Sequence, residues 1–176
     1  MKKLKLDELG RMPVEEFKVT KKIPLVIILE DIRSALNVGS VFRSADAFPV
    51  EKIILTGITA QPPHKDILKT ALGATDSVEW GFVEKLNDAI ANLKSKGYSV
   101  YAIEQTDNST MLTHFSPSDK VAVIFGNEVE GVKTETILNC DGCIELPQYG
   151  TKHSLNIAVC AGIVIYDLFH KMKGES

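Results

Sequence analysis

The chain has 176 residues, 44% hydrophobic and 24% charged, which suits one ordinary globular domain and is too short for two. No window approaches the roughly 18 uninterrupted apolar residues of a membrane-spanning helix, and the basic N-terminus lacks the apolar core of a secretory signal, so we expect a cytoplasmic protein without a membrane partner. The net charge of −3 does not favour a nucleic-acid binder, but residues 1–22 hold seven Lys/Arg against four Asp/Glu. We expect a basic N-terminal segment over 1–23 and one domain over 24–176.

Apolar runs alternate with amphipathic segments along the chain. The expected strands, in order, are 25–30, 52–57, 77–80, 99–104, 121–126 and 143–147. The expected helices are 38–48, 65–73, 84–96, 132–139 and 155–172. This alternation predicts an α/β fold, a single domain with a mostly parallel sheet and helices on both faces. Ligands of such sheets bind at the carboxyl ends of the strands, and several of these ends are rich in Gly and small polar residues.

The first segment that could carry chemistry is EDIRSALNVGSVFRSADAF, residues 30–48. Asn37 is expected to be the N-cap of the following helix. Arg43 lies in an otherwise apolar stretch and therefore needs a partner, which is either a carboxylate in the core or a phosphate from outside. The residues alone leave both alternatives open.

The second segment, VAVIFGNEVEGV (121–132), runs from a buried strand into a glycine-rich turn. Gly126 and Gly131 permit close backbone approach or positive φ. The phosphate-loop pattern is missing. An acidic residue at a strand end, here Glu128, suits a ribose hydroxyl, an amine or an arginine, although an ordinary tight turn is the simpler alternative.

The third segment is IELPQYGTKHSLNIAVCAG, residues 144–162. Ser154 is expected to cap the long final helix, whose free amides could bind a polar ligand. That helix is so apolar that it is either deep in the core or packed on a partner subunit. His153 has no recognisable nucleophile beside it, and we expect it to be solvated, as we do His64 and His114. The lone CxxC of Cys140 and Cys143 is a weak metal signal, and we expect a structural role and no metal site.

In this order, the three segments resemble the sequence motifs of the SpoU (TrmH) family of the SPOUT superfamily. NVGSVFRSADA is similar to the family's Asn-x-Gly-x-x-x-Arg-x-Ala motif, GNEVEGV to Gly-x-Glu-x-x-Gly, and LPQYGTKHSLNIA to Pro…Ser-Leu-Asn-x-(Ser/Ala). The segment 69–80, KTALGATDSVEW, is similar to the family's stretch after the second strand. The resemblance extends from about residue 24 to residue 172.

The resemblance implies an S-adenosyl-L-methionine-dependent RNA methyltransferase that modifies a ribose 2′-hydroxyl in tRNA or rRNA. It also implies a deep trefoil knot within about residues 121–172 and a homodimer built on the first and last helices. The positions that match the family's cofactor contacts are Ile103, Glu104, Gly126, Asn127, Glu128, Gly131, Ile144, Leu146, Ser154 and Leu155. The catalytic set it implies is Arg43, Asn37, Glu128, Ser154 and Asn156.

The resemblance also implies that Arg43 works beside the cofactor bound by the other subunit. A guanidinium rarely gives up its proton, so a simple general-base role is awkward. We expect Arg43 to grip a substrate phosphate bidentately and to position the hydroxyl. With only about 23 residues before the first strand, RNA recognition would fall to the basic N-terminal segment and the dimer surface.

Two alternatives predict different sequences. Another nucleotide-cofactor α/β enzyme would have a phosphate-binding first turn, whereas DIRSALNVGS has a single glycine. A catalytically inactive RNA-binding module of the same fold would have lost Arg43, Asn156 or the pair Gly126 and Gly131, all of which are present.

Overall fold

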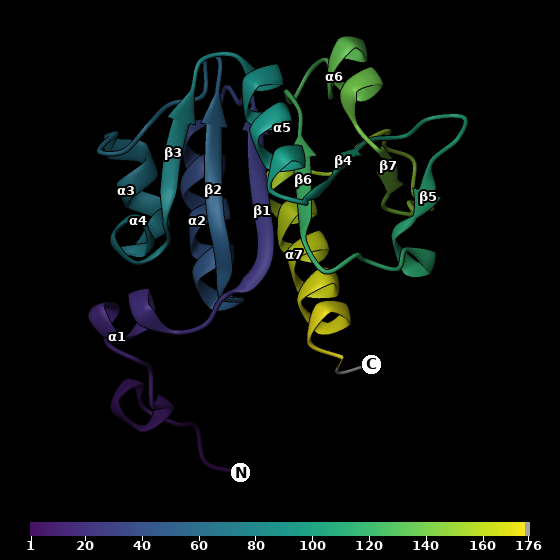
Figure 1. The fold of residues 1–176 in the computed structure, drawn as a ribbon. Coiled ribbons are helices and arrows are strands. Elements are labelled where there is room, and N and C mark those ends of the chain that lie inside the picture. Colours follow the sequence, from purple (N-terminus) through teal and green to yellow (C-terminus); the bar gives the residue numbers. More distant parts are fainter. Residues whose placement is uncertain (175–176) are drawn as a thin grey trace.

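The structure, a computed structural model, describes residues 1–174. Its centre is a seven-stranded sheet of order β3-β2-β1-β6-β4-β7-β5, in which all the paired strands are parallel (Figure 1). The strands are β1 (Ile23–Glu30), β2 (Val50–Thr56), β3 (Trp80–Val83), β4 (Ser99–Ile103), β5 (Thr110–Met111), β6 (Val121–Phe125) and β7 (Gly142–Glu145). The helices are α1 (Val14–Val19), α2 (Ala35–Ala47), α3 (Lys65–Ala71), α4 (Ala74–Ser77), α5 (Leu86–Ser95), α6 (Thr134–Asn139) and α7 (Ile157–Lys173), with 3-10 turns η1 (Leu6–Leu9) and η2 (Leu112–His114).

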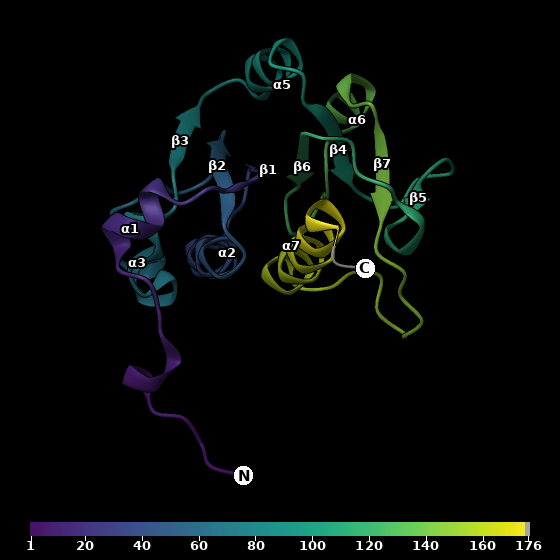
Figure 2. The same ribbon diagram turned by 60° about the horizontal axis from the view of Figure 1, so that its bottom comes forward.

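Both faces of the sheet are covered, as the continuous apolar run of β1 predicts. Figure 2 shows α2, α3 and α7 on one face and α5 and α6 on the other. Because strand side chains alternate between faces, Leu25, Ile27 and Leu29 pack in the core under α2 and α7. Val26 and Ile28 pack in the opposite core with residues of α5. The predicted α/β domain is therefore confirmed.

Two predicted elements have the wrong boundaries, and one strand was not predicted. The expected strand 77–80 is instead the end of α4 followed by β3, and Ser77 uses its hydroxyl to donate to Asp46. The expected helix 65–73 stops at Ala71, because Leu72 and Gly73 adopt φ of 50° and 90°, which no helix tolerates. Strand β5 is too short, at two residues, for its pattern to be visible in the sequence.

Two predicted helix caps are also wrong. Ser34, not Asn37, caps α2, and its side chain accepts a hydrogen bond from the backbone N–H of Asn37. Asn156, not Ser154, caps α7, and its side chain accepts from the first amides of that helix. In both cases the helix start lies where the cap side chain reaches an amide two or three residues ahead.

The N-terminal segment extends away from the body of the domain, beside the face that carries α2 and α3 (Figures 1 and 2). Helix α1 joins it to the domain, and Phe17 packs against the core. Among the described residues, no helix is long and apolar enough to cross a membrane.

Candidate functional site

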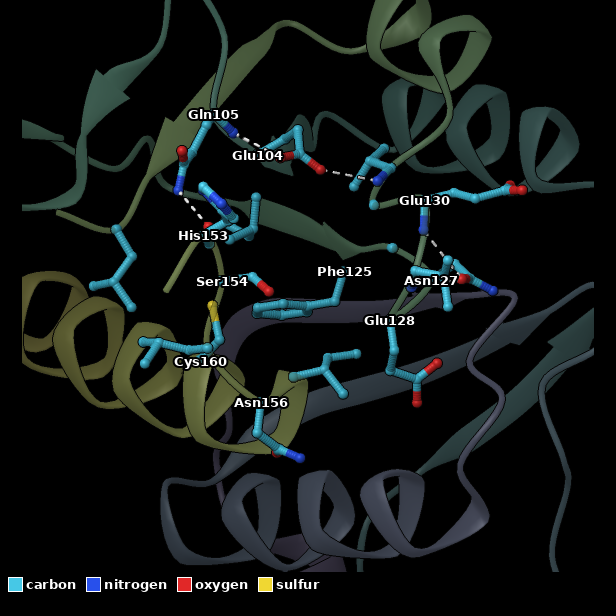
Figure 3. Close-up of a pocket in the computed structure, with 18 of the residues that line it drawn as sticks. Glu104, Gln105, Phe125, Asn127, Glu128, Glu130, His153, Ser154, Asn156 and Cys160 are labelled. Atoms are coloured by element: carbon cyan, nitrogen blue, oxygen red, sulfur yellow. Dashed lines mark hydrogen bonds between the residues drawn. The ribbon is translucent and has the colours of Figure 1, made fainter. Parts of the chain in front are cut away.

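A cavity of about 590 Å³ opens where β4 and β6 end and α7 begins (Figure 3). Three sequence-distant segments form its walls: the residues after β4, the loop after β6 and the approach to α7. We call it the strand-end cavity, and it is lined by Ile103, Glu104, Gln105, Phe125, Gly126, Asn127, Glu128, Val129, Glu130, Gly131, Val132, Leu146, Gln148, His153, Ser154, Leu155, Asn156, Ile157 and Cys160. It lies at the sheet edge that the parallel topology predicts for a ligand.

The loop after β6 is shaped by two glycines. A Cβ at Gly126 would lie 2.2 Å from the backbone of Gly131 and Val132, so the chain can pass only if the residue has no side chain. Gly131 has φ of +72°, and a Cβ there would lie 2.2 Å from Glu104 Oε2. Gly126 is therefore required by close backbone approach and Gly131 by its positive φ, which are the two roles that the sequence allows.

Asn127 fixes the same loop from within. Its Oδ1 accepts from the backbone N–H of Val129 at 2.8 Å and from that of Glu130 at 3.3 Å. Its Nδ2 donates to the carbonyl of Asp31 at 2.9 Å, which ties the loop to the end of β1. The loop is consequently held in one shape by its own side chain.

Behind the loop, charged groups anchor the start of α6. Lys133 forms an ion pair with Asp31 at 2.6 Å. The neighbouring Glu30 is buried and accepts a hydrogen bond from the hydroxyl of Thr136 at 2.6 Å. Burial raises the pKa of Glu30 and outweighs this hydrogen bond, which favours the carboxylate. These contacts stabilise the rear wall of the strand-end cavity.

Glu128 joins this loop to the start of α2. Its carboxylate accepts from the backbone N–H of Arg33 at 2.9 Å, from that of Ser34 at 3.1 Å and from Asn37 Nδ2 at 3.0 Å. Partial burial acts to raise the pKa of Glu128, but these hydrogen bonds outweigh it and hold the pKa below its usual value. Glu128 is therefore a carboxylate at neutral pH, held in place by three donors.

A directional chain of hydrogen bonds then reaches α7. Asn156 uses its Oδ1 to cap α7, so its Nδ2 is left to donate to Asn37 Oδ1 at 3.1 Å. Asn37 in turn donates to Glu128. In Figure 3, Glu128 and Asn156 point toward the same side of the cavity, away from Glu104. The three motif segments thus meet through the side chains of Asn37, Glu128 and Asn156.

The opposite wall combines a carboxylate with apolar side chains. Glu104 accepts from the backbone N–H of Gln105 at 2.8 Å and from that of Val132 at 3.0 Å. Gln105 donates across the cavity mouth to the carbonyl of His153 at 3.3 Å (Figure 3). The apolar part of the lining consists of Ile103, Phe125, Val129, Val132, Leu146, Leu155 and Ile157.

Arg43 does not line the strand-end cavity. It is exposed on α2, and among residues 1–174 it has no hydrogen-bond or ion-pair partner. It lines a second hollow, formed by α2 and α3, that shares no residue with the strand-end cavity. Of the two partners that the sequence allows, a core carboxylate is thus excluded within the described chain, which leaves an external anion.

The structure brings together most of the predicted cofactor contacts. All of them line the strand-end cavity except Ile144, which is fully buried in β7 behind the wall. Glu128, Ser154 and Asn156 of the predicted catalytic set also line it. Phe125, which is hidden in an apolar run, was not predicted as a lining residue. Neither were Gln105, the residues Val129, Glu130, Val132, Gln148 and His153 within the motif loops, or Ile157 and Cys160 of α7.

The other candidate residues have ordinary surroundings. His64 caps α3 by accepting from the backbone N–H of Asp66, so it is not simply solvated. His153 is exposed, yet it also lines the strand-end cavity. Burial raises the pKa of Cys140 to about 12, so this thiol stays protonated and unreactive at neutral pH. Within residues 1–174, no group of three or more His, Cys, Asp or Glu is placed to hold a metal ion.

The parallel sheet, the glycine-shaped loop and the strand-end cavity define an α/β domain with a small-molecule-sized site at the carboxyl edge of its sheet. The model of the SpoU rRNA Methylase family matches residues 24–166, and the chain belongs to this family.

Relatives and solved structures resemble the chain over most of its length. It is 31% identical over 142 residues to the 23S rRNA (guanosine-2′-O-)-methyltransferase RlmB of Neisseria meningitidis, covering 81% of this chain and 56% of that protein. A putative TrmH family tRNA/rRNA methyltransferase of Staphylococcus saprophyticus is 28% identical, and the match covers 90% of this chain and 63% of that protein. The chain thus spans about three fifths of these relatives. The A. aeolicus TrmH/SpoU tRNA modifying enzyme has the same fold, with a TM-score of 0.82 at 21% identity, covering 92% of this chain and 82% of that one.

Proposed function

We propose that the chain is an RNA methyltransferase of the cytoplasm that transfers a methyl group from S-adenosylmethionine to a ribose 2′-hydroxyl of ribosomal or transfer RNA. The observation that carries this proposal is the joining of the three motif segments by Asn37, Glu128 and Asn156 at the rim of one cavity. Family membership supports the same reaction. The relatives described above are named as an rRNA methyltransferase and a tRNA/rRNA methyltransferase.

The lining of the strand-end cavity fits this cofactor. Its volume of about 590 Å³ is within the range of small-molecule sites. Phe125, Leu146 and Ile157 offer apolar surface for a purine, while Glu104 and Glu128 offer carboxylates for hydroxyl or cationic groups. When bound, the cofactor supplies an electrophilic methyl group on a cationic sulfur. The residues that would hold it are Ile103, Glu104, Gly126, Asn127, Glu128, Gly131, Leu146, Ser154 and Leu155, with Ile144 supporting the wall from behind.

The residues beside the strand-end cavity would order the RNA. Asn37 and Asn156 keep the Glu128 carboxylate and the start of α7 in fixed positions, so little reorganisation is needed on binding. Ser154 lines the same rim and is free to face a ribose. Arg43 would grip a substrate phosphate with its planar fork, and the phosphate rather than the arginine would help to remove the hydroxyl proton.

The substitution Arg43→Lys tests whether the bidentate guanidinium of Arg43 is needed. Arg43→Lys keeps the charge but loses the bidentate geometry, so we expect methyl transfer to fall about tenfold or more while cofactor affinity is unchanged. Arg33→Lys is the matched control, because Arg33 contacts Glu128 through its backbone. Native transfer by Arg43→Lys would show that bidentate gripping is wrong.

A homodimer belongs to the same proposal. Leu155, Val159, Ile163 and Tyr166 form an exposed apolar stripe that begins just before α7 and continues along it, and Leu36 is exposed at the start of the adjacent α2. Arg43 does not line its own chain's cavity, which suits an arginine that acts beside the cavity of a second copy. The proposal also includes the deep trefoil knot that the resemblance implies within about residues 121–172. The sheet order, in which β4 lies between β6 and β7, is compatible with such a knot.

Subunit mixing tests the shared site. Arg43→Ala and the cavity variant Gly126→Val are each expected to be inactive as homodimers. After re-association, about a quarter of the sites should regain activity, because half of the dimers are mixed and each has one complete site. Absence of any regain would contradict an arginine supplied by the partner.

The reaction itself is tested with labelled S-adenosylmethionine and total tRNA or rRNA, followed by mass spectrometry of the nucleosides. We expect 2′-O-methylated nucleosides. Methylation of bases alone would contradict the ribose target, and calorimetry that detects binding of neither S-adenosylmethionine nor S-adenosylhomocysteine would contradict the cofactor.

A further inference from the structure

The hollow formed by α2 and α3 contains a second cation, Lys69, which lies outside the three motifs and begins the segment 69–80 that resembles the family's stretch after the second strand. Its lining is Ser40, Arg43, Ser44, Ala47, Phe48, Lys69 and Thr70, and we call it the α2 hollow. Lys69 of α3 is exposed, and like Arg43 it has no hydrogen-bond or ion-pair partner among residues 1–174. Two unpaired cations therefore face one hollow from two different helices.

Close packing of the two helices fixes this arrangement. A Cβ at Gly39 would lie 2.3 Å from the carbonyl oxygen of Ile67, so the helices can approach this closely only at a glycine. Thr70 donates from its hydroxyl to the carbonyl of Leu36 at 2.9 Å, which pins α3 to α2 beside Lys69. Gly39 precedes Arg43 by about one turn of α2. The backbone positions of Lys69 and Arg43 are thus fixed relative to each other by the packing of α3 against α2.

The chemistry of the lining selects an anion. No carboxylate lines the α2 hollow. The nearby Asp46 accepts a hydrogen bond from Ser77, so it is engaged elsewhere. Phe48 provides an apolar edge and is held by an edge-on contact with Tyr166, with ring centroids 5.5 Å apart. An anionic group attached to a less polar body, such as a phosphodiester with its sugar, fits these surfaces.

We propose that the α2 hollow binds a backbone phosphodiester of the RNA and that Lys69 is a positioning residue that shares this phosphate with Arg43. The proposal rests on the proposed function, because the phosphate must belong to the RNA that is methylated. Arg43 contributes a planar fork and Lys69 a point charge, so together they fix the position of the phosphate as well as its charge.

The salt dependence of RNA binding tests Lys69. The probe is a fluorescently labelled, mixed-sequence single-stranded RNA, measured by anisotropy over a series of salt concentrations. We expect Lys69→Gln to lower the affinity several-fold and to reduce the slope of log affinity against log salt by about 0.7, the value for one lost phosphate contact on a single strand. Lys85→Gln is the control, because it removes the same charge from an exposed lysine beside α5, on the other face of the sheet.

A double-mutant cycle tests whether the phosphate is shared. If Arg43 and Lys69 hold one phosphate, Lys69→Gln should have a smaller effect in an Arg43→Gln background than alone. In methylation assays, Lys69→Gln should raise KM for RNA more than it lowers kcat. A loss of folding would instead lower the apparent kcat and the thermal midpoint and leave KM unchanged. Fully additive effects of the two substitutions would overturn the proposal that Arg43 and Lys69 hold the same phosphate.

The outcomes separate this proposal from the proposed function. If the protein methylates RNA but Lys69→Gln behaves like Lys85→Gln, the α2 hollow proposal is overturned and the proposed function stands. If the Lys69-dependent slope is found but neither methyl transfer nor cofactor binding occurs, the proposed function is overturned and the phosphate contact is supported. A wild-type protein that binds no RNA would overturn both.

Discussion

Two polar side chains of α2, Asn37 and Arg43, differ in whether they have hydrogen-bond partners within the chain. Near the start of the helix, Asn37 is hydrogen-bonded to both Glu128 and Asn156. Six residues later, Arg43 has no partner among the described residues. A small ligand is best held by groups that internal hydrogen bonds have already fixed, whereas a polyanion supplies the missing partners of exposed cations. The contrast supports our proposals that the strand-end cavity holds the cofactor and that the α2 hollow binds a phosphate of the RNA.

The largest expected effect on the cavity side follows from filling Gly126. Gly126→Ala places a Cβ 2.2 Å from the backbone of Gly131 and Val132, so the loop must shift. We expect a loss of about 1–3 kcal/mol in the free energy of unfolding and a clear loss of cofactor affinity, measured by chemical denaturation and calorimetry. Gly150→Ala is the control, because its Cβ would meet no described atom within 4 Å. Equal stability of the two variants would refute the close approach.

Breaking the hydrogen-bond chain should have an intermediate effect. Asn156→Ala removes the cap of α7, which costs about 1 kcal/mol, and also removes the donor to Asn37. Because the two side chains are in direct contact, Asn37→Ala and Asn156→Ala should be non-additive in a double-mutant cycle measured by urea denaturation.

Asn139→Ala provides the comparison for this cycle. Asn139 ends α6 and bonds Asn87 at the surface, so its loss should matter less. Additive effects of Asn37→Ala and Asn156→Ala would show that the chain of hydrogen bonds carries no coupling.

The smallest expected effect concerns the pH dependence of stability. Since the pKa of Glu128 is lowered in the folded protein, its stabilising contribution is present above the unfolded pKa of about 4.3. It is lost as pH falls through the lower folded value. The difference in unfolding free energy between wild type and Glu128→Gln should therefore shrink from pH 7 toward strongly acidic pH. This difference is small because the side chain is exposed to solvent.

Glu130→Gln serves as the control for this titration. Its carboxylate is exposed two residues away and has no hydrogen-bond partner among the described residues. A pH dependence equal to that of Glu128→Gln would show that the three donors to Glu128 do not stabilise its charged form.

The sequence predicts most of the fold because buried strands and helices have recognisable patterns of apolar residues. The apolar run of β1 is buried on both faces, and the ends of β4 and β6, with Glu104, Gly126 and Glu128, line the strand-end cavity. The approximate positions of the principal helices follow from their amphipathic periodicity. Their boundaries do not, because Ser34 rather than Asn37 reaches the free amides of α2.

The parts of the site that could not be predicted depend on contacts between distant segments. The partners of Asn37 are 91 and 119 residues away, so local spacing suggests only a cap. In the sequence, Phe125 is one of several apolar residues of a buried strand, and only the three-dimensional arrangement of the strands shows that it lines the cavity. In the sequence, Lys69 has the pattern of an ordinary helix-surface lysine. Its place beside Arg43 depends on the close packing of α3 against α2 at Gly39.

The most direct test of this division is to measure cofactor binding and methyl transfer on the same variant. We expect Arg43→Ala to bind S-adenosylmethionine in calorimetry with wild-type affinity but to transfer methyl groups to RNA about a hundredfold more slowly or worse, a loss of roughly 3 kcal/mol in transition-state stabilisation. If Arg43→Ala instead lost cofactor affinity, or kept wild-type transfer, the assignment of the cofactor and the RNA to separate sides of α2 would be contradicted.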